Sequence, residues 1–440
     1  MIVFLILSIL SKTKMCRNIY LIKGVAPCFV EFWVYRGGGR AMVGAMEIAH
    51  GMQLAYCTNI HRGESWGETF ATLKEYTLRV KRQVCPDEQY GIGLRLSAEA
   101  AGELISTDGE LSRFRQWLQD HGCYVYTING FPYGTFHGQR VKEQVYRPDW
   151  TTQERLVYTC LLFDILSELL PAGMSGSVST LPGSFKEFVV DEELQAGQMV
   201  ENLLKCHRHI QVLRERTGQD LHLGLEPEPL GYFETTAETV SFFERLKIAA
   251  QAAGDDVDEV LNNIGVNYDT CHLAVEYEQA GEALGRLKAA GIRISKIHLS
   301  SALRLVPSAE AREKLKAFEE DVYLHQVVVR VGDEVVRRFR DLPDALAFAE
   351  ADGAVVGDEW RVHFHVPLHA EPEGLFGDTR EHLLATMQVL ADDPALCSHF
   401  EIETYTWAVM PEAMRAGDVV DQIVKEYQWC LQAFARVKLA

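Results

Sequence analysis

The sequence predicts an α/β fold of the (β/α)₈ barrel class on the strength of two observations. Eight segments of strand length are spread over residues 53–405, and stretches with helical periodicity separate them. Four of the later segments also end in acidic or imidazole side chains. Strands that alternate with helices form parallel sheets, and a barrel gathers the carboxyl ends of its strands around one mouth. The sequence therefore predicts a barrel with a functional site at that mouth.

The expected strands leave room for helices between them. They are residues 53–59, 91–96, 123–129, 176–180, 221–226, 264–269, 293–299 and 400–405. Capping boxes are expected where a Thr precedes a Glu by three residues, as at Thr151 with Glu154 and Thr235 with Glu238. Neither a G-x-G-x-x-G nor a G-x-x-x-x-G-K-[ST] segment opens a helix, which argues against a dinucleotide or ATP fold.

The connection between the seventh and eighth strands is unusually long. Residues 303–370 contain helix candidates at 308–320 and 343–352, and between these an alternating run with a turn at Gly332 and Asp333. An insertion after a barrel strand lies at the catalytic face, so we expect a lid or a pocket wall. The alternative is an oligomerisation arm, which would serve a homodimer.

The first 51 residues differ in composition from the rest of the chain. They carry six basic and two acidic residues, whereas the whole chain has 43 basic and 62 acidic ones. The apolar run at residues 2–10 is shorter than the roughly 20 residues of a membrane span, and no positive charge precedes it. We interpret residues 1–51 as an extension from a misplaced start codon, with a signal or anchor and a genuine arm as alternatives. One domain is then expected over residues 52–440.

The overall charge and the cysteines narrow the functional class. A net charge of −19 disfavours nucleic acid and anionic membranes as partners, so a small organic substrate is expected. The ten cysteines include no C-x-x-C pair, which argues against a structural zinc site or a redox pair. A reducing, cytoplasmic location fits this pattern.

The strand ends predict a site for one divalent cation. Glu226, Asp269 and His298 end three successive expected strands, and the last expected strand carries Glu401 and Glu403. These two share a strand face, but only Glu403 is close enough to the carboxyl end to reach the mouth. Three carboxylates and one imidazole suit Mn²⁺, Mg²⁺ or Co²⁺, with Zn²⁺ as a further option. A charge-paired mouth without metal is the alternative.

Several motifs resemble a known superfamily. The pattern D-T-x-H, then H-x-S, then E-[ST]-[FY], preceded by an E-P strand, resembles the xylose-isomerase-like TIM barrels, among them sugar isomerases, 3-epimerases and inosose dehydratases. The resemblance covers roughly residues 53–435. The longer blocks C-T-N-I-H-R-G-E, N-G-F-P-Y-G, V-S-T-L-P-G-S-F-K and I-E-T-Y-T-W resemble the EboE family, described as metabolite traffic proteins and often labelled sugar phosphate isomerase/epimerase. That family begins near Met52.

This resemblance implies roles for individual residues. The ketose epimerase pattern makes four residues the metal ligands: Glu226, Asp269, His298 and Glu403. It places His272 and Arg304 against the substrate. The implied chemistry is proton transfer next to a carbonyl through an enediolate, with Glu226 and Glu403 as base and acid. A sugar, a sugar phosphate or a cyclitol would be the substrate.

Further polar residues are expected around a polyhydroxylated ligand. Asn59 and His61 lie at the end of the first strand, and Asn129 begins an aromatic loop, for which an ordinary turn is the alternative. His363 and His365 share a strand face, and we expect them to line the pocket. A second metal there is the less favoured alternative, because the early strands end in Arg95 and Asn129 rather than in further ligands.

The fold leaves the reaction open. A dehydratase or a hydrolase could use the same metal site, and a non-catalytic metabolite-binding protein is a further alternative.

Overall fold

The computed structural model describes residues 47–138, 140–371, 374–411, 415 and 417–440. Most of the predicted N-terminal extension, up to residue 46, lies outside the described residues. The short strand β1 (Glu47–Ile48) pairs antiparallel with β2 (Met52–Tyr56), the first strand of the barrel.

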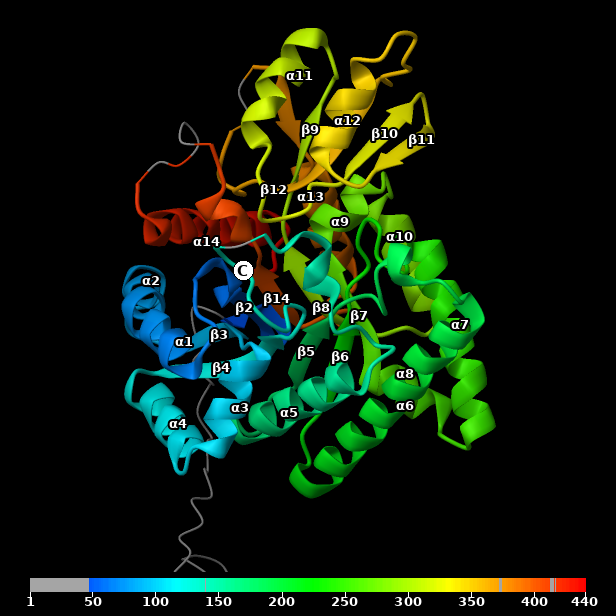
Figure 1. Ribbon diagram of the computed structural model, residues 1–440. Coiled ribbons are helices and arrows are strands. Elements are labelled where there is room, and N and C mark those ends of the chain that lie inside the picture. The colour runs from blue at the N-terminus through cyan, green and yellow to red at the C-terminus, as the bar shows by residue number, and fades with distance from the viewer. Residues whose placement is uncertain (1–46, 139, 372–373, 412–414, 416) are drawn as a thin grey trace, which may run out of the picture. The chain divides into compact units, whose positions relative to one another are not determined.

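Eight parallel strands form the barrel, as the sequence predicts (Figure 1). Their order around the barrel is β2, β14, β8, β7, β6, β5, β4 and β3, and a parallel bridge between Cys57 and Gly93 joins β2 to β3. Every residue of these strands is buried. The strands after β2 are β3 (Tyr90–Arg95), β4 (Cys123–Asn129), β5 (Gly176–Thr180), β6 (Leu221–Leu225), β7 (Ile264–Asp269), β8 (Ile294–Leu299) and β14 (His399–Ile402).

Helices lie outside the strands and cover them (Figure 1). Their bounds are α1 (Trp66–Thr72), α2 (Leu78–Val84), α3 (Ala98–Ser106), α4 (Glu110–Asp120), α5 (Gln153–Leu169), α6 (Glu192–Thr217), α7 (Thr236–Ala253), α8 (Val257–Asn263), α9 (Thr270–Val275), α10 (Ala280–Ala289), α13 (Arg380–Asp392) and α14 (Val419–Arg436).

The two predicted capping boxes have different outcomes. Thr235 and Glu238 form a capping box at the start of α7, as predicted. At α5 the prediction is wrong by one residue, because Thr152 is the N-cap and accepts from the backbone N–H of Arg155. The Thr151 hydroxyl is instead bonded to Asp149.

The insertion between β8 and β14 forms a second, antiparallel sheet. Its strands run in the order β11, β10, β12, β9, β13, and the β10–β11 hairpin turns at Gly332 and Asp333 as predicted. Trp360, Phe364 and Leu346 belong to an apolar core of its own. The elements of the insertion are β9 (Ala302–Leu305), α11 (Ala309–Leu315), β10 (Val327–Val331), β11 (Glu334–Phe339), α12 (Leu342–Ala349), β12 (Glu359–His365) and β13 (Phe376–Asp378).

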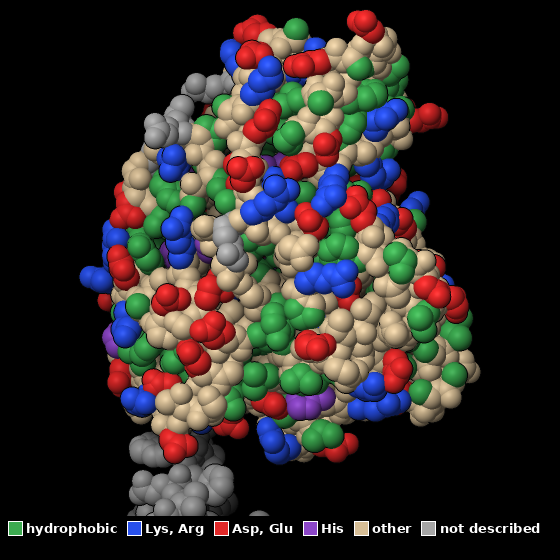
Figure 2. All heavy atoms as spheres, viewed as in Figure 1, with side chains coloured by type: hydrophobic (Ala, Val, Ile, Leu, Met, Phe, Trp, Pro, Cys, Tyr) green, Lys and Arg blue, Asp and Glu red, His purple; other side chains and the backbone are tan. Residues whose placement is uncertain are grey.

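The surface seen in Figure 2 carries acidic and basic side chains side by side, with small groups of apolar side chains between them. Among the described residues, no helix has both the length and the apolar character needed to cross a membrane.

Candidate metal centre

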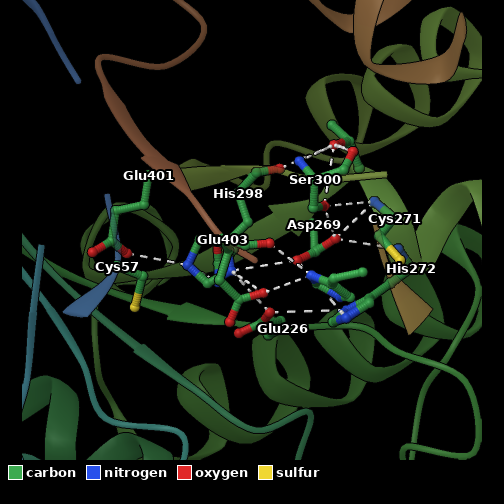
Figure 3. A network of polar contacts seen from close by, with 12 residues as sticks. Cys57, Glu226, Asp269, Cys271, His272, His298, Ser300, Glu401 and Glu403 are labelled. Carbon is green, nitrogen blue, oxygen red and sulfur yellow. Dashed lines mark hydrogen bonds and ion pairs between the residues drawn. The ribbon is translucent and has the colours of Figure 1, made fainter. Parts of the chain in front are cut away.

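The four predicted ligands meet at the carboxyl ends of the barrel strands. Glu226 follows β6, Asp269 ends β7, His298 lies one residue before the end of β8, and Glu403 follows β14. All four side chains are buried, and one ligand atom from each lies within 4.8 Å of the others. Figure 3 shows the three carboxylates gathered on one side of the His298 ring.

The His298 Nδ1 atom is turned toward these carboxylates. It lies 3.1 Å from Glu226 Oε1, 3.4 Å from Asp269 Oδ2 and 3.8 Å from Glu403 Oε2. Burial lowers the pKa of His298, but the negative charges of Glu226 and Glu403 outweigh burial and hold the pKa well above its ordinary value. The site therefore attracts positive charge strongly.

One oxygen of each of the three buried carboxylates has no hydrogen-bond partner among the described residues: Glu226 Oε2, Asp269 Oδ2 and Glu403 Oε2. Burial raises the pKa of Glu403 well above its ordinary value, and Asp269 and Glu226 add to the rise against the effect of His298. A buried carboxylate oxygen without a hydrogen bond carries a free-energy cost, which a bound cation would remove. The donor set thus fits a divalent cation.

Local structure orients two of the candidate ligands. Asp269 is the N-cap of α9, and its Oδ1 atom accepts from the backbone N–H groups of Cys271 (2.7 Å) and His272 (3.2 Å), which leaves Oδ2 for the centre. His298 bonds through Nε2 to Glu401 Oε2 at 3.1 Å. A carboxylate behind the outer ring nitrogen fixes the orientation of a ligating imidazole.

Glu401 lies deeper in the barrel than Glu403 and is itself paired with the buried Lys296. Burial raises the pKa of Glu401, but the Lys296 ammonium outweighs burial and lowers it to about 2. A side chain at Gly93 would overlap the Glu401 carboxylate, so glycine leaves the space that this ion pair occupies.

A pocket opens beside the centre, and both the barrel and the insertion line it. Asn59 donates from Nδ2 to Glu403 Oε1 at 2.9 Å, so the first strand's loop touches a candidate ligand directly. Aromatic rings form much of the wall. The lining residues include Asn59, Asn129, Phe131, Phe136, Lys142, Tyr146, Glu226, Glu228, His272, Tyr323, Gln326, His363, Glu403 and Tyr405.

Most of the residues predicted to bind substrate lie at this pocket. Asn59, Asn129, His272 and His363 line it, and the ring centre of His365 lies 5.5 Å from that of His272. Burial lowers the pKa of His363 well below its ordinary value and that of His365 to about 4. Both rings are therefore neutral at physiological pH.

Two residues predicted to bind the substrate, His61 and Arg304, lie outside this pocket, contrary to the prediction. His61 Nε2 is hydrogen-bonded to the Tyr56 hydroxyl at 2.9 Å, and its ring stacks on Tyr76 with centres 4.5 Å apart. Arg304 lies on β9 and pairs with Glu381 of α13. The insertion's first strand begins at Ala302, and its pairing with β12 and β13 directs Arg304 away from the pocket.

Sequence reasoning missed other residues of the pocket wall. Glu228, two residues after Glu226 in the segment E-P-E-P, has a buried side chain that faces the pocket beside Tyr146. Burial and the neighbouring Glu226 raise the pKa of Glu228 well above its ordinary value. The second Glu of E-P-E-P was the available signal. Tyr323 comes from the insertion, and no sequence pattern connected it with the barrel mouth.

Comparison with known proteins finds distant structural resemblances. No family model and no curated protein matches the chain. Among solved structures, the IOLI protein with a bound zinc atom is 12% identical, with 88% of this chain and 99% of that chain covered and a TM-score of 0.47. A xylose isomerase domain protein from Planctomyces limnophilus is 12% identical over 87% and 96% of the two chains, with a TM-score of 0.46. The 3-keto-D-glucoside 4-epimerase YcjR from E. coli is 15% identical over 67% and 96%, with a TM-score of 0.34.

Proposed function

We propose that this protein is a metal-dependent isomerase or epimerase that acts on a small polyhydroxylated metabolite. The observation that carries the proposal is the pair Glu226 and Glu403. Both line the pocket, both lie beside Asp269 and His298 in the candidate metal centre, and each keeps one carboxylate oxygen without a hydrogen-bond partner among the described residues. Paired carboxylates in different surroundings are the groups that proton transfer requires.

Four donors would hold the metal: Glu226, Asp269, His298 through Nδ1, and Glu403. The three carboxylates favour Mn²⁺, Mg²⁺ or Co²⁺, and the imidazole also admits Zn²⁺. When bound, such an ion supplies Lewis-acid polarisation to a carbonyl group of the substrate.

The chain's own groups would move the proton. Glu226 takes a proton from the carbon next to the carbonyl, and Glu403 returns one to that carbon. Asn59 holds Glu403 through its 2.9 Å hydrogen bond, and Glu401 holds the His298 ring. The buried setting keeps bulk water from these groups.

The pocket lining supports the substrate class. Asn59 and Asn129 offer neutral amide groups to hydroxyls, while Phe131, Tyr323 and Tyr405 offer ring faces to C–H groups. The blocks that resemble the EboE family extend the proposal to a role in processing or traffic of a precursor of a secondary metabolite.

Deuterium exchange tests the proposal. The full chain loaded with Mn²⁺ is incubated in D₂O with sugars, cyclitols and their phosphates, and NMR follows the carbon next to the carbonyl. We expect exchange with a sugar or cyclitol, and a fall of about 10²–10⁴-fold in Glu226→Gln and Glu403→Gln. Glu310→Gln, which replaces an exposed side chain of α11, is the matched control.

Three other outcomes of this experiment would contradict the proposal or change the assigned function. Full activity in both Gln variants would refute the assigned roles. Ligand binding without exchange would identify a non-catalytic metabolite-binding protein, and a product that has lost or gained water would identify a dehydratase or hydrolase.

A further inference from the structure

Two side-chain contacts fix the alignment of α5 and α6, which pack side by side on the outside of the barrel (Figure 1). Gln153 Nε2 donates to Asn202 Oδ1 at 2.7 Å near one end of α5. Further along both helices, His209 Nε2 lies 2.9 Å from Asp164 Oδ1. Residue numbers rise together from the first pair to the second, so the two helices run in the same direction.

This alignment brings two thiols together. Cys160 lies four residues before Asp164 on α5, and Cys206 lies three residues before His209 on α6. Side chains three or four residues apart share one face of a helix, so both cysteines lie on the faces that meet, one turn before the Asp164–His209 pair. The side chains of Cys160 and Cys206 are hydrogen-bonded to each other, and both thiols are free of disulfides.

The surroundings of the two thiols differ. Cys160 is half-buried, whereas Cys206 is fully buried. The hydrogen bond from Cys206 lowers the pKa of Cys160 against the effect of burial, and the charge of His209 adds to the lowering. The same hydrogen bond, together with burial, raises the pKa of Cys206 well above its ordinary value. Solvent access and thiolate character therefore make Cys160 the more reactive thiol.

We propose that Cys160 and Cys206 form a reversible redox site, in which a peroxide converts the two neighbouring thiols to a disulfide. The absence of a C-x-x-C pair argued against a redox pair in the sequence, but these cysteines come from two different helices, and only the packing of α5 on α6 makes them neighbours. The site does not depend on the isomerase or epimerase proposal, since it lies outside the barrel.

The reaction has two steps. The Cys160 thiolate attacks one oxygen of the peroxide, so that an S–O bond forms, the O–O bond breaks, and one water (or alcohol) leaves with the proton of the thiol. The Cys206 sulfur then attacks the Cys160 sulfur, an S–S bond forms, and the S–O bond breaks with release of a water that takes the second proton. Two thiols have lost two electrons and two protons, and the peroxide has gained them. A small dithiol reverses the reaction by exchange.

Both helices hold the segment that walls the pocket. Arg155 of α5 donates to the backbone oxygens of Gly130 (2.7 Å) and Phe131 (3.0 Å), and Asn202 of α6 donates to the backbone oxygen of Trp150 at 2.9 Å. Phe131 lines the pocket. A disulfide between α5 and α6 would therefore restrain the two helices that carry this wall.

Peptide mapping tests the redox site. The full chain is treated with hydrogen peroxide while folded, the remaining thiols are alkylated, and the protein is digested with trypsin without reduction. Cleavage after Arg and Lys places Cys160 in the peptide 156–186 and Cys206 in the peptide 206–208. We expect these two peptides to be joined in the oxidised protein, with a loss of two hydrogen atoms in mass, and to separate after treatment with dithiothreitol.

Single variants distinguish the two thiols. Cys206→Ser should lose the link and leave a sulfenic acid on Cys160, which dimedone traps on peptide 156–186. Cys160→Ser should also lose the link, but peptide 206–208 should stay unmodified because Cys206 is buried. Cys430→Ala is the matched control, since Cys430 is buried in α14 and should leave the link unchanged. Near-UV circular dichroism of each variant shows whether the fold persists.

Three outcomes would overturn the proposal. The first is a folded wild-type chain in which peroxide leaves both peptides unlinked. The second is a link that forms only after the chain is unfolded in urea, because the folded packing of α5 and α6 would then not bring the thiols together. The third is a dimedone adduct on Cys206 in Cys160→Ser that forms as fast as the adduct on Cys160 in Cys206→Ser, which would refute the distinct roles.

Discussion

The pKa values of two buried carboxyl groups, Glu401 and Glu426, are shifted in opposite directions by their neighbours. Glu401 lies beside Lys296, and its pKa is lowered to about 2 although burial opposes the shift. Glu426 of α14 is equally buried, but its partners are the Thr404 hydroxyl (2.7 Å) and the Leu368 backbone N–H (3.1 Å). Neutral donors do not offset burial, so the pKa of Glu426 rises to about 7.

Glu426 makes stability depend on pH. A carboxyl whose pKa rises from its ordinary value of 4.5 to about 7 on folding binds its proton more tightly in the folded state. Its unfavourable contribution to the free energy of unfolding is therefore absent below pH 4.5. It grows as pH rises from 4.5 to about 7 and persists at higher pH. We expect Glu426→Gln to raise the free energy of unfolding by roughly 1–3 kcal/mol at pH 8 and by little at pH 4.

Urea unfolding at the two pH values measures this difference. Asp421→Asn, on the exposed face of the same helix, is the control and should show no such pH dependence. An equal effect of Glu426→Gln at both pH values would contradict the assignment.

At the level of elements, the barrel strands could be predicted because segments of strand length alternate with stretches of helical periodicity. The short strands β9 and β13 of the insertion could not, because they have four and three residues and are defined by their pairing: β9 pairs with β12 and β13, and β13 pairs with β9. Candidate ligands at strand ends could be predicted, since parallel strands end at one mouth. Arg304 could not be placed, because its direction depends on how the insertion folds back.

The insertion is tied to the barrel by ion pairs. Arg338 of β11 bonds through Nε to Glu276 Oε2 at 3.1 Å and lies 3.5 Å from Glu234 Oε1. Both carboxylates are buried on the barrel side, and removing the cation takes the ion-pair partner from Glu276, whereas Glu234 keeps Lys186. We expect Arg338→Met to lower the free energy that opens the insertion by about 1–3 kcal/mol, so that the insertion opens more often.

Hydrogen exchange resolves this opening. Amides of β10 and β11 should exchange faster in Arg338→Met, while those of β5 and β6 keep their protection. Arg337→Met is the control, because Arg337 stacks on Phe348 within the insertion. Equal acceleration in both sheets would mean that the variant destabilises the whole chain instead.

Across the whole molecule, polar groups fill the barrel from its lower end to its mouth. His399 bonds to Ser177 (2.8 Å) and His222 to Ser295 (2.6 Å), Lys296 and Glu401 pair above them, and the candidate metal ligands come last. These lower groups form hydrogen bonds and an ion pair with one another, whereas each of the three carboxylates at the mouth keeps one oxygen without a hydrogen-bond partner among the described residues. Stability of the whole barrel should therefore depend on the cation.

Chelation is expected to lower the melting temperature. An ion present at 100 times its dissociation constant stabilises the folded state by about 2.7 kcal/mol, which corresponds to a few degrees for a chain of this size. Thermal unfolding with EDTA, and then with added Mn²⁺, measures the effect. Glu226→Gln should show a smaller difference between the two conditions, and an unchanged melting temperature in the wild type would argue against a resident ion.

The placement of the two β12 histidines has a consequence for regulation. The insertion has an apolar core of its own, while the carboxylates that face His363 and His365 belong to barrel segments. Affinity for a metabolite in the pocket would then depend on how closely the insertion packs against the barrel mouth. By thermodynamic linkage, a metabolite that contacts both parts strengthens this packing by the same factor as the packing strengthens its binding.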